Sequence, residues 1–234
     1  MRDHPSPISP LRQAPSLALS YRVREPAPSS PKACVILLHG VGGNETNLAE
    51  LAAAIDPSVL VVLPRGPLQL GFDQYAWFRV AFTPEGPRLD PAEANRAREA
   101  LLDFIAGIKA TYQLGAEQIV LAGFSQGGIM SASVALSEPE RVRGFGILSG
   151  RILPELAPYL ASRERLGSMQ AFISHGEQDN VLPVSWALRA EQGLTELGVA
   201  YESHRYAAGH VLTHAMQSDF LVWCDTLLGT HSSR

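Results

Sequence analysis

A serine flanked by glycines is the first feature of the chain that could do chemistry. The stretch Gly123-Phe124-Ser125-Gln126-Gly127 fits the G-x-S-x-G pattern, in which a strained strand-to-helix turn raises a serine hydroxyl above a sheet. The glycines are needed there because larger side chains would collide with neighbouring backbone. Glycine-rich turns that contain serine are also ordinary connections. The pattern therefore predicts a nucleophile only if a base and an orienting acid accompany it.

The chain supplies candidates for both partners in the expected order. A serine hydroxyl becomes nucleophilic when a base takes its proton and a third group orients that base. In α/β-hydrolases the order along the chain is Ser, then Asp or Glu, then His. Asp179 follows the apolar run "MQAFISHG", and His210 follows the last predicted strand. Glu177 is a rival acid, and Asp179 could instead be a solvated loop residue or a helix cap.

The remaining histidines fit the role of a base less well. His39 and His175 precede glycine turns and are interpreted as supporting groups, while the others lie in a strand or near the chain ends (His204, His4 and His231). His214 follows His210 at the spacing of a metal-binding pair. However, Val211 stands where the H-E-x-x-H pattern has glutamate, and no third ligand is apparent. No metal site is therefore expected.

Two glycine-rich turns could supply the oxyanion hole that acyl transfer needs. Backbone N–H groups suit this task because they are held in place and do not titrate. One candidate donor is Gln126, at the start of the helix after the serine, where the helix dipole also favours negative charge. The other is Val41, within "HGVGG". The alternative is that "HGVGG" is only a tight connection between a strand and a helix.

Six short β-rich runs are predicted to be the strands that position these groups. Most are continuously apolar, which is typical of a parallel sheet covered by helices on both faces. Helical periodicity fills the intervals, and Asp90, Pro91 and Glu93 predict a capped helix start. The predicted strands are residues 33–40, 59–66, 118–124, 144–150, 169–176 and 201–206, and the predicted helices are 44–55, 90–112, the segment after Ser125, 184–198 and 211–229. The fold class is α/β.

Ligands of open parallel sheets bind beyond the carboxyl ends of the strands. Four predicted strands end in polar or glycine-rich stretches: "HGVGGNE" from His39, "SQGG" from Ser125, "SGR" from Ser149 and "HGEQDN" from His175. The candidate serine, acid and oxyanion donors all lie in these stretches. The sequence therefore predicts that they meet at one edge of the sheet.

Length and composition bound the organisation of the chain. A chain of 234 residues suits one large α/β domain, and 46% hydrophobic against 18% charged residues excludes a mainly disordered protein. Seven of the 17 prolines lie within residues 1–31, which predicts an irregular leader with one edge strand in "SLALSYRVRE". Residues 32–234 are expected to form a single catalytic domain.

Charge, apolar runs and cysteines indicate location and partners. A net charge of −4 without a basic run gives no reason to expect nucleic-acid binding. The first residues lack the apolar core of a secretory signal, and no apolar run could cross a bilayer. We therefore expect a cytoplasmic protein without stable membrane insertion, and the question of a homodimer is left open. Cys34 and Cys224 lie in separate apolar segments and are interpreted as buried thiols.

Seven blocks carry a resemblance to a known family. The set "LLHGVGGNE", "PRGP", "AWF", "GFSQGG", "LSG", "HGEQDNVLP" and "AGH" resembles the carboxylesterase, lysophospholipase and acyl-protein thioesterase family of compact α/β-hydrolases. The resemblance covers the chain from about Cys34 to its end. It implies Ser125 as nucleophile, Asp179 as orienting acid and His210 as base. It also implies Val41 and Gln126 as oxyanion donors.

One departure bears on the substrate. Many eukaryotic thioesterase relatives have Asp after the "HGxG" turn, where this chain has Gly43-Asn44. In this respect the chain looks closer to bacterial esterase-like members. The departure weakens the expectation of protein depalmitoylation.

The expected reaction is hydrolysis of a small acyl ester through an acyl-enzyme, without a cofactor. Residues 151–168 leave little room for a large lid, which favours short to medium acyl chains. The alternatives are a thioesterase or lysophospholipase for longer chains, or a hydrolase-fold binding protein without catalysis. The expected acyl pocket consists of Leu68, Leu70, Trp77, Phe78, Ile152 and Leu153, which could instead be core or loop packing.

Overall fold

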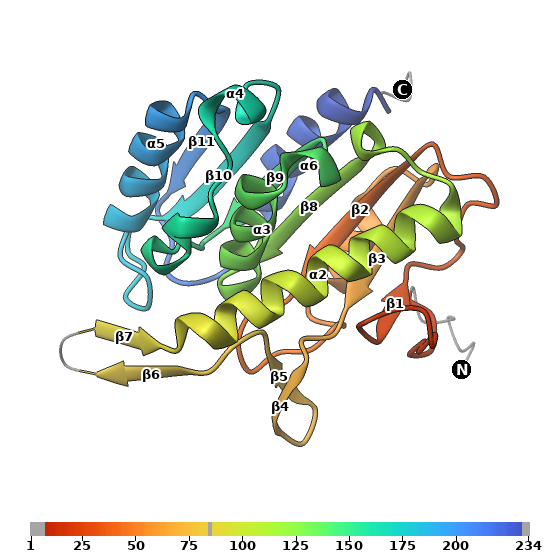
Figure 1. Ribbon diagram of the computed structural model, residues 1–234, viewed down its shortest axis with the longest axis horizontal. Helices are drawn as coiled ribbons and strands as arrows, with labels where there is room; N and C mark the ends of the chain where they lie inside the picture. Colours follow the sequence, from red (N-terminus) through yellow and green to blue (C-terminus); the bar gives the residue numbers. More distant parts are fainter. Residues whose placement is uncertain (1–7, 84–85, 231–234) are drawn as a thin grey trace.

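The six predicted strands form six adjacent parallel strands of one sheet, and a short antiparallel strand forms one edge of that sheet (Figure 1). The computed structural model describes residues 8–83 and 86–230. The strand order is β1-β3-β2-β8-β9-β10-β11. The strands are β1 (Tyr21–Val23), β2 (Ala33–Leu38), β3 (Val59–Pro64), β8 (Ile119–Phe124), β9 (Gly144–Leu148), β10 (Gln170–Gly176) and β11 (Ala200–Tyr206).

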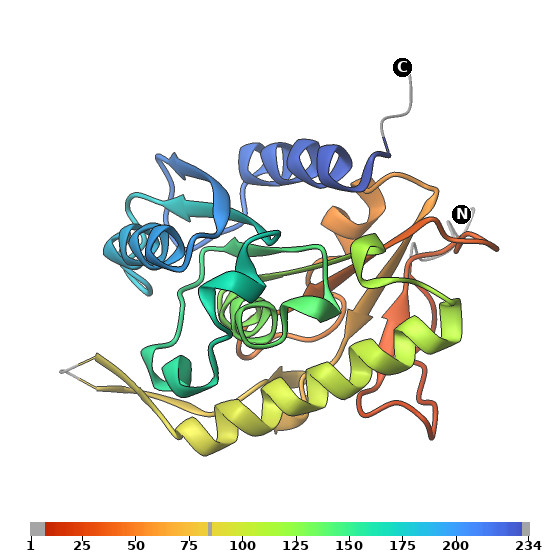
Figure 2. The same cartoon turned by 45° about the horizontal axis from the view of Figure 1, so that its top comes forward.

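Helices cover both faces of this sheet, as the continuous apolar strands predict. The helices are α1 (Ala49–Ala54), α2 (Pro91–Tyr112), α3 (Gln126–Ser137), α4 (Arg163–Leu166), α5 (Ser185–Leu197) and α6 (His214–Leu228). Buried side chains of α2, α3 and α5 belong to one core layer and those of α1 and α6 to the other. Figure 2 shows α6 and α1 on the opposite side of the sheet from α2 and α3.

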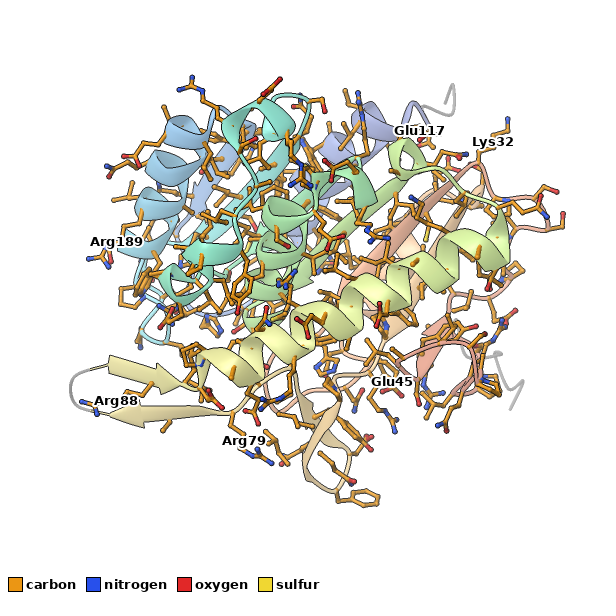
Figure 3. The ribbon with its side chains drawn as sticks, in the orientation of Figure 1. Lys32, Glu45, Arg79, Arg88, Glu117 and Arg189 are labelled. Atoms are coloured by element: carbon orange, nitrogen blue, oxygen red, sulfur yellow. The ribbon has the colours of Figure 1, made fainter. Side chains whose placement is uncertain are left out.

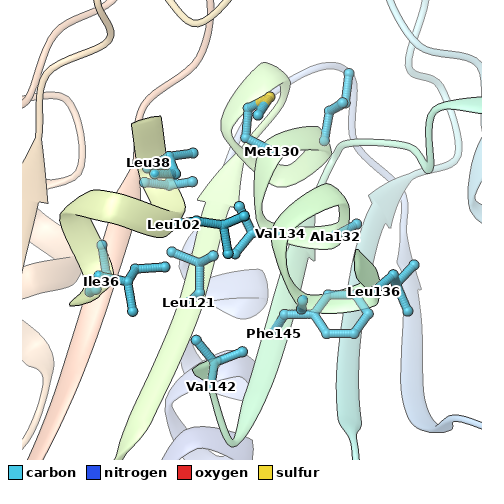
Figure 4. Packing of buried hydrophobic residues seen from close by; sticks show 14 of the residues in the cluster. Ile36, Leu38, Leu102, Leu121, Met130, Ala132, Val134, Leu136, Val142 and Phe145 are labelled. Atoms are coloured by element: carbon cyan, nitrogen blue, oxygen red, sulfur yellow. The ribbon is translucent and has the colours of Figure 1, made fainter. Parts of the chain in front are cut away.

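Alternation within each strand divides the core between these layers. In β2, Ile36 and Leu38 belong to the layer of α2 and α3, while Val35 and Leu37 belong to the layer of α1 and α6. Figure 4 shows the first layer, where Met130 and other side chains of α3 lie against the sheet. Both faces of the strand are apolar because both are buried. The α/β-hydrolase fold predicted from the sequence is confirmed.

The leader contributes the edge strand that its sequence predicts. Tyr21 pairs with Pro64 in the antiparallel register of β1 with β3, and Ile8 joins the buried core. The buried Arg24 side chain donates hydrogen bonds to backbone carbonyls after α1, including that of Val59 at 2.6 Å. Residues 8, 9 and 19–24 thus pack on the sheet, and a domain boundary at residue 32 stays a prediction.

The start of α2 agrees with the sequence in part. Asp90 is the N-cap, its carboxylate accepting from the Ala92 N–H at 2.9 Å, and Pro91 is the first helical residue. Glu93 does not cap the helix start as expected, because its carboxylate accepts from the backbone N–H and the guanidinium of Arg79 instead. A charged donor on a neighbouring segment provides a stronger hydrogen bond than the helix's own N-cap amide.

Two hairpins between β3 and α2 were not predicted. They consist of β4 (Leu68–Gly71) with β5 (Gln74–Ala76), and β6 (Val80–Thr83) with β7 (Gly86–Leu89). Both extend from one end of the sheet (Figure 1). Their strands are short and carry proline, glycine and polar residues, so they lack the apolar periodicity that identifies the other strands. Between β9 and β10 lie only a 3-10 segment (Pro154–Tyr159) and the single turn of α4, so the described chain has no large lid there.

The two cysteines are free and buried, as predicted. Burial raises the pKa of both thiols above its usual value, and the charge of Asp225 adds to this for Cys224. Neither thiol therefore has thiolate character at neutral pH. Within the described ranges, no helix combines the length and the apolar content needed to cross a membrane.

Candidate active site

Ser125 lies on a strained turn between β8 and α3. Its φ of 54° and ψ of −116° are sparsely populated for a residue with a side chain, and such strain recurs at functional sites. The turn is held by a hydrogen bond from the Ser125 N–H to the Leu148 carbonyl, at 2.8 Å. A Cβ at Gly123 would collide with Gly127 backbone, and one at Gly127 would collide with the Leu38 carbonyl. Both glycines of the pattern are therefore required by close backbone approach.

Three side chains from three strand ends meet in one hydrogen-bonded row. His210 Nε2 lies 2.9 Å from Ser125 Oγ, and His210 Nδ1 lies 2.6 Å from Asp179 Oδ2. Asp179 and Ser125 are buried, whereas the His210 side chain is partly exposed. The structure thus brings together the serine, acid and base expected from the sequence.

The Asp179 carboxylate is held on both oxygens. Oδ1 accepts from the backbone N–H groups of Val181 and Leu182, at 2.9 and 2.8 Å, so it closes its own loop. Oδ2 is left to accept from the Nδ1–H of His210. This places the proton of a neutral His210 on Nδ1 and leaves Nε2 free to accept from the serine hydroxyl. Asp179 does not cap α5, whose N-cap is Val184.

The other histidines occupy supporting or surface positions. His175 is fully buried, lies 3.5 Å from Asp179 Oδ2 and donates from Nε2 to the Leu182 carbonyl at 2.7 Å. His204 lies within β11, and His214 is exposed at the start of α6. His4 and His231 lie outside the described residues. The rival acid Glu177 is exposed.

The two expected oxyanion donors flank Ser125 in the same cavity. Val41 follows β2 and Gln126 begins α3, and both line the cavity with Ser125. Within the described residues, neither backbone N–H has a hydrogen-bond acceptor. Both are therefore available to a developing negative charge. Their role in catalysis stays a prediction.

His39 secures the loop that carries Val41. Its Nδ1 donates to the Gly40 carbonyl at 2.7 Å and its Nε2 accepts from the Gly66 N–H at 2.9 Å. Trp77 Nε1 donates to the His39 carbonyl at 2.9 Å. Burial lowers the pKa of His39, although its bond to Gly40 and the charge of Glu45 oppose this. A neutral imidazole matches one donated and one accepted bond, so His39 is a supporting group.

Glu45 anchors the far end of the same loop. Its buried carboxylate accepts from Arg65 at 2.7 Å on each oxygen, and from Arg22 of β1 at 2.8 Å (Figure 3). Burial alone would raise the pKa of Glu45, but the hydrogen bonds from Arg65 and Arg22 outweigh burial and lower it from 4.5 to about 2. Ionised Glu45 thus connects the Val41 loop to β1 and to the segment after β3.

This ion cluster should make stability depend on acid pH. Because the folded pKa of Glu45 is lower than the unfolded one, its stabilisation is complete above pH 4.5 and is lost as the pH falls toward 2. The pH-dependent part is about 3 kcal/mol. Urea unfolding at several pH values should show the stability difference between wild type and Glu45→Gln shrinking below pH 4.5. A difference that stays constant down to pH 2.5 would contradict this assignment.

The Gln126 side chain connects the serine turn to the segment before the β6–β7 hairpin. Its Oε1 accepts from the Trp77 N–H at 2.8 Å, and its Nε2 donates to the Phe78 carbonyl at 2.7 Å. All of these groups are buried. The bonds position Phe78 beside Ser125, since both residues line the same cavity.

We expect Gln126→Met to lower the free energy of unfolding by about 2–5 kcal/mol, because two buried backbone groups would lose their partners. Gln118→Met is a matched control, since Gln118 also bonds two backbone groups (Gly115 N–H and Lys32 carbonyl), at a more exposed position. Water can replace its bonds, so the control should cost less than about 1 kcal/mol. Equal losses in chemical denaturation would show that burial of these bonds is unimportant.

Comparison with known proteins shows the family of the chain. Residues 21–226 match the model of a family described as phospholipase/carboxylesterase. The chain belongs to this family. Acyl-protein thioesterase 1 of Emericella nidulans is 28% identical over 204 residues, which cover 77% of this chain and 84% of the relative. This phospholipase/carboxylesterase family member is a carboxylic ester hydrolase.

Solved structures share the fold of this family member. Esterase PE8 is 25% identical with a TM-score of 0.76, over 88% of this chain and 97% of the other. A carboxylesterase from Mesorhizobium loti is 22% identical with a TM-score of 0.79, over 92% of this chain and 98% of the other. The second likeness concerns the fold alone.

The local packing of this family member suits glycine at position 43, where many eukaryotic thioesterase relatives have aspartate. A Cβ at Gly43 would collide with the Asn47 side chain, whose Oδ1 accepts from the Asn44 N–H. Gly43 also pairs with Tyr75 of β5, whose N–H donates to the Gly43 carbonyl at 2.8 Å. An aspartate at position 43 would disturb this packing. The first hairpin is thus attached to the Val41 loop.

The cavity beside Ser125 in this family member is lined mostly by residues other than those expected for the acyl pocket. Of the six predicted residues, only Phe78 lines it. Leu68 and Leu70 lie on the outer hairpin, Trp77 and Leu153 are buried in the core, and Ile152 packs against the core. The cavity has a volume of about 300 Å³, and its apolar lining is Phe78, Val80, Leu89, Phe124, Ile129, Val181 and Leu182. The segment that contains Trp77 and Phe78 is irregular, so no periodicity in the sequence marks which of the two lines the cavity.

Arg151 also lines this cavity and was not identified from the sequence as a site residue. The available signal was its place in "SGR", directly after β9 and therefore at the ligand-binding edge of the sheet. Charged residues are common in loops, so its type did not distinguish it from a solvated arginine.

Proposed function

We propose that the chain is a serine esterase in which Ser125 is the nucleophile, His210 the general base and Asp179 the orienting acid. The observation that carries this proposal is the unbroken hydrogen-bonded row from Ser125 Oγ through His210 to Asp179, at 2.9 and 2.6 Å. It lies at the wall of an apolar cavity, with Val41 and Gln126 as the oxyanion donors. Each role needs the group that the residue provides.

The proposed reaction has two steps. Ser125 Oγ attacks the ester carbonyl carbon while His210 Nε2 accepts the hydroxyl proton, and the oxyanion binds the N–H groups of Val41 and Gln126. The intermediate then expels the alcohol, which receives the proton from His210. A water that is deprotonated by His210 next attacks the acyl-enzyme, and its collapse releases the acid and restores Ser125. Asp179 stays ionised and stabilises the imidazolium in both steps.

Two hollows that meet at the row support the assignment of acyl and alcohol sides. The apolar cavity of about 300 Å³ suits the acyl group, because it is at the small end of ligand sites. The second hollow, of about 490 Å³, shares Gly40, Val41, Phe124 and His210 with the first. It also has polar lining from Asn47, Glu50 and Gln217. We assign the leaving alcohol to it.

The size of the apolar cavity favours esters of short to medium acyl chains. A thioesterase or lysophospholipase acting on longer chains is the second candidate, supported by the similarity to acyl-protein thioesterase 1. A cytoplasmic location stays a prediction.

A labelling experiment tests the proposal. The protein is treated with a fluorophosphonate, and intact mass is compared between wild type and Ser125→Ala, with p-nitrophenyl ester hydrolysis followed in parallel. One adduct on wild type, absent from the variant, is the expected result. A folded wild type that is neither labelled nor active would overturn the proposed mechanism.

Chain length separates the two candidates. We expect kcat/KM to be highest for p-nitrophenyl esters between butanoate and octanoate, and lower for palmitate, because the cavity holds a limited number of methylene groups. Thioesters of the same acyl groups provide the comparison of leaving groups. A maximum at palmitate would favour the long-chain candidate.

A further inference from the structure

Arg151 is a buried cation inside the apolar cavity. It follows Gly150, whose own Cα lies so close to the serine turn that an added Cβ would be 2.9 Å from the Ser125 carbonyl oxygen. The Arg151 side chain is 4% exposed, yet it lines the same cavity as Ser125 and His210. A nearly buried guanidinium thus belongs to the wall that would hold the acyl group.

The guanidinium forms no hydrogen bond and no close ion pair with the described residues. Arg151 Nε is buried without an acceptor. Arg151 Cζ lies over the ring of Trp186 on α5, 4.4 Å from its centroid. Glu155 interacts with Arg151 through its charge, but its buried Oε2 has no hydrogen-bond partner either. Arg151 is therefore held by its contact with the Trp186 ring, and its N–H donors have no acceptor among the described residues.

Such an arrangement is costly unless it serves a ligand. Burial of a charged group without a hydrogen-bonded partner is strongly unfavourable, and a cation–π contact compensates only in part. Burial lowers the pKa of Arg151 despite the charge of Glu155, but an arginine keeps its proton at neutral pH. Its planar fork of donors matches a carboxylate with two parallel hydrogen bonds.

We propose that Arg151 binds a carboxylate on the acyl part of the substrate, so that the preferred substrates are half-esters of dicarboxylic acids. This inference rests on the proposed function, because the acyl group must enter the cavity beside Ser125. The apolar side chains of the cavity contact the methylene groups between the ester and the carboxylate. Arg151 determines specificity and takes no part in bond breaking.

Matched pairs of methyl esters test this preference. Monomethyl succinate, glutarate and adipate are compared with methyl butanoate, pentanoate and hexanoate, which have the same chain lengths but no charge. We expect kcat/KM to be about 10 to 100 times higher for at least one charged ester than for its neutral partner, as a charged hydrogen-bonded pair gives. Equal or lower values for every charged ester would overturn the proposal.

Variants of the two arginines that contact Trp186 supply the control. Arg189 Cζ lies 4.7 Å from the Trp186 ring centroid, but its side chain is exposed and projects outward from α5 (Figure 3). Arg151→Met should lower the ratio of kcat/KM for the charged ester to kcat/KM for its neutral partner to about one or below. Arg151→Lys should retain part of it, because lysine keeps the charge without the fork. Arg189→Met should leave the preference unchanged, and its loss there would contradict the assignment.

A binding measurement keeps this proposal separate from the proposed mechanism. Calorimetric titration of monomethyl glutarate into Ser125→Ala requires no turnover, and methyl pentanoate provides the neutral comparison. Monomethyl glutarate should bind at least tenfold tighter than methyl pentanoate, and Arg151→Met in the same background should abolish the difference. Absence of any difference overturns the role of Arg151 even if neutral esters are hydrolysed. If the tighter binding of the charged ester is lost in the Arg151→Met variant, the role of Arg151 is supported even if labelling of Ser125 fails.

Discussion

Replacement of Ser125 by alanine is expected to lower kcat/KM for esters by about 10⁴- to 10⁶-fold, as in other serine triads. The row from Asp179 to His210 would remain, but no oxygen would be in place to attack the carbonyl carbon. Residual hydrolysis would come from the oxyanion donors acting on water. Steady-state kinetics with p-nitrophenyl butanoate measures the loss, and circular dichroism checks the fold.

Ser149 offers a matched control for this substitution. It directly follows the neighbouring strand β9, is buried and also has a positive φ, of 51°. Its Oγ has no hydrogen-bond partner among the described residues, unlike that of Ser125. Ser149→Ala should therefore change kcat/KM by no more than about twofold, since the substitution removes no interaction. A comparable loss in both variants would indicate a general disturbance of the strand ends, and the nucleophile would have to be sought elsewhere.

Asp179→Asn is expected to lower kcat by about 10⁴-fold with the geometry intact. Oδ1 accepts from two backbone N–H groups, so the asparagine oxygen must take this place. The amide NH₂ group is then directed at His210 Nδ1, which can no longer be a donor. The imidazole proton then lies on Nε2, which faces Ser125 Oγ. A protonated Nε2 cannot accept the serine proton.

The exposed neighbour Glu177 is the control for this loss. Glu177→Gln removes the same charge two residues away and should leave kcat within about twofold of wild type, because an exposed carboxylate is well screened. The tautomer change can be read directly from the imidazole nitrogen shifts of His210 in nuclear magnetic resonance spectra. A normal rate for Asp179→Asn, or a large loss for Glu177→Gln, would assign the orienting role to the rival acid.

Much of this site could be predicted because residues that follow the strands of a parallel sheet lie together at one edge of it. Continuous apolar runs such as that ending at Leu38 identify buried parallel strands, and the residues after them meet at one edge. Ser125 and His210 are 85 positions apart, yet both follow strands that belong to one sheet. The type and order of the polar groups at strand ends were enough to name them.

The lining of the cavity could not be predicted in this way. Whether Trp77 or Phe78 faces the substrate depends on which of two neighbours points inward, and no periodicity marks this in an irregular segment. The structure reveals the cause, because Gln126 binds the backbone of both residues and so sets the direction of their side chains. Arg151 was missed for a related reason. Its burial depends on the contact with Trp186, which comes from a helix 35 positions later.

The place of His210 in the chain has a consequence for the order in which the protein acquires its activity. The base lies between β11 and α6, and α6 contributes Phe220 and Trp223 to the core under β10. Contacts between distant segments form slowly because loop closure costs entropy before they stabilise anything. During synthesis the serine turn can therefore form long before the histidine is available to it. In a refolding experiment, ester turnover should return last, after the helical signal has recovered. An incomplete chain that lacks His210 should not hydrolyse esters.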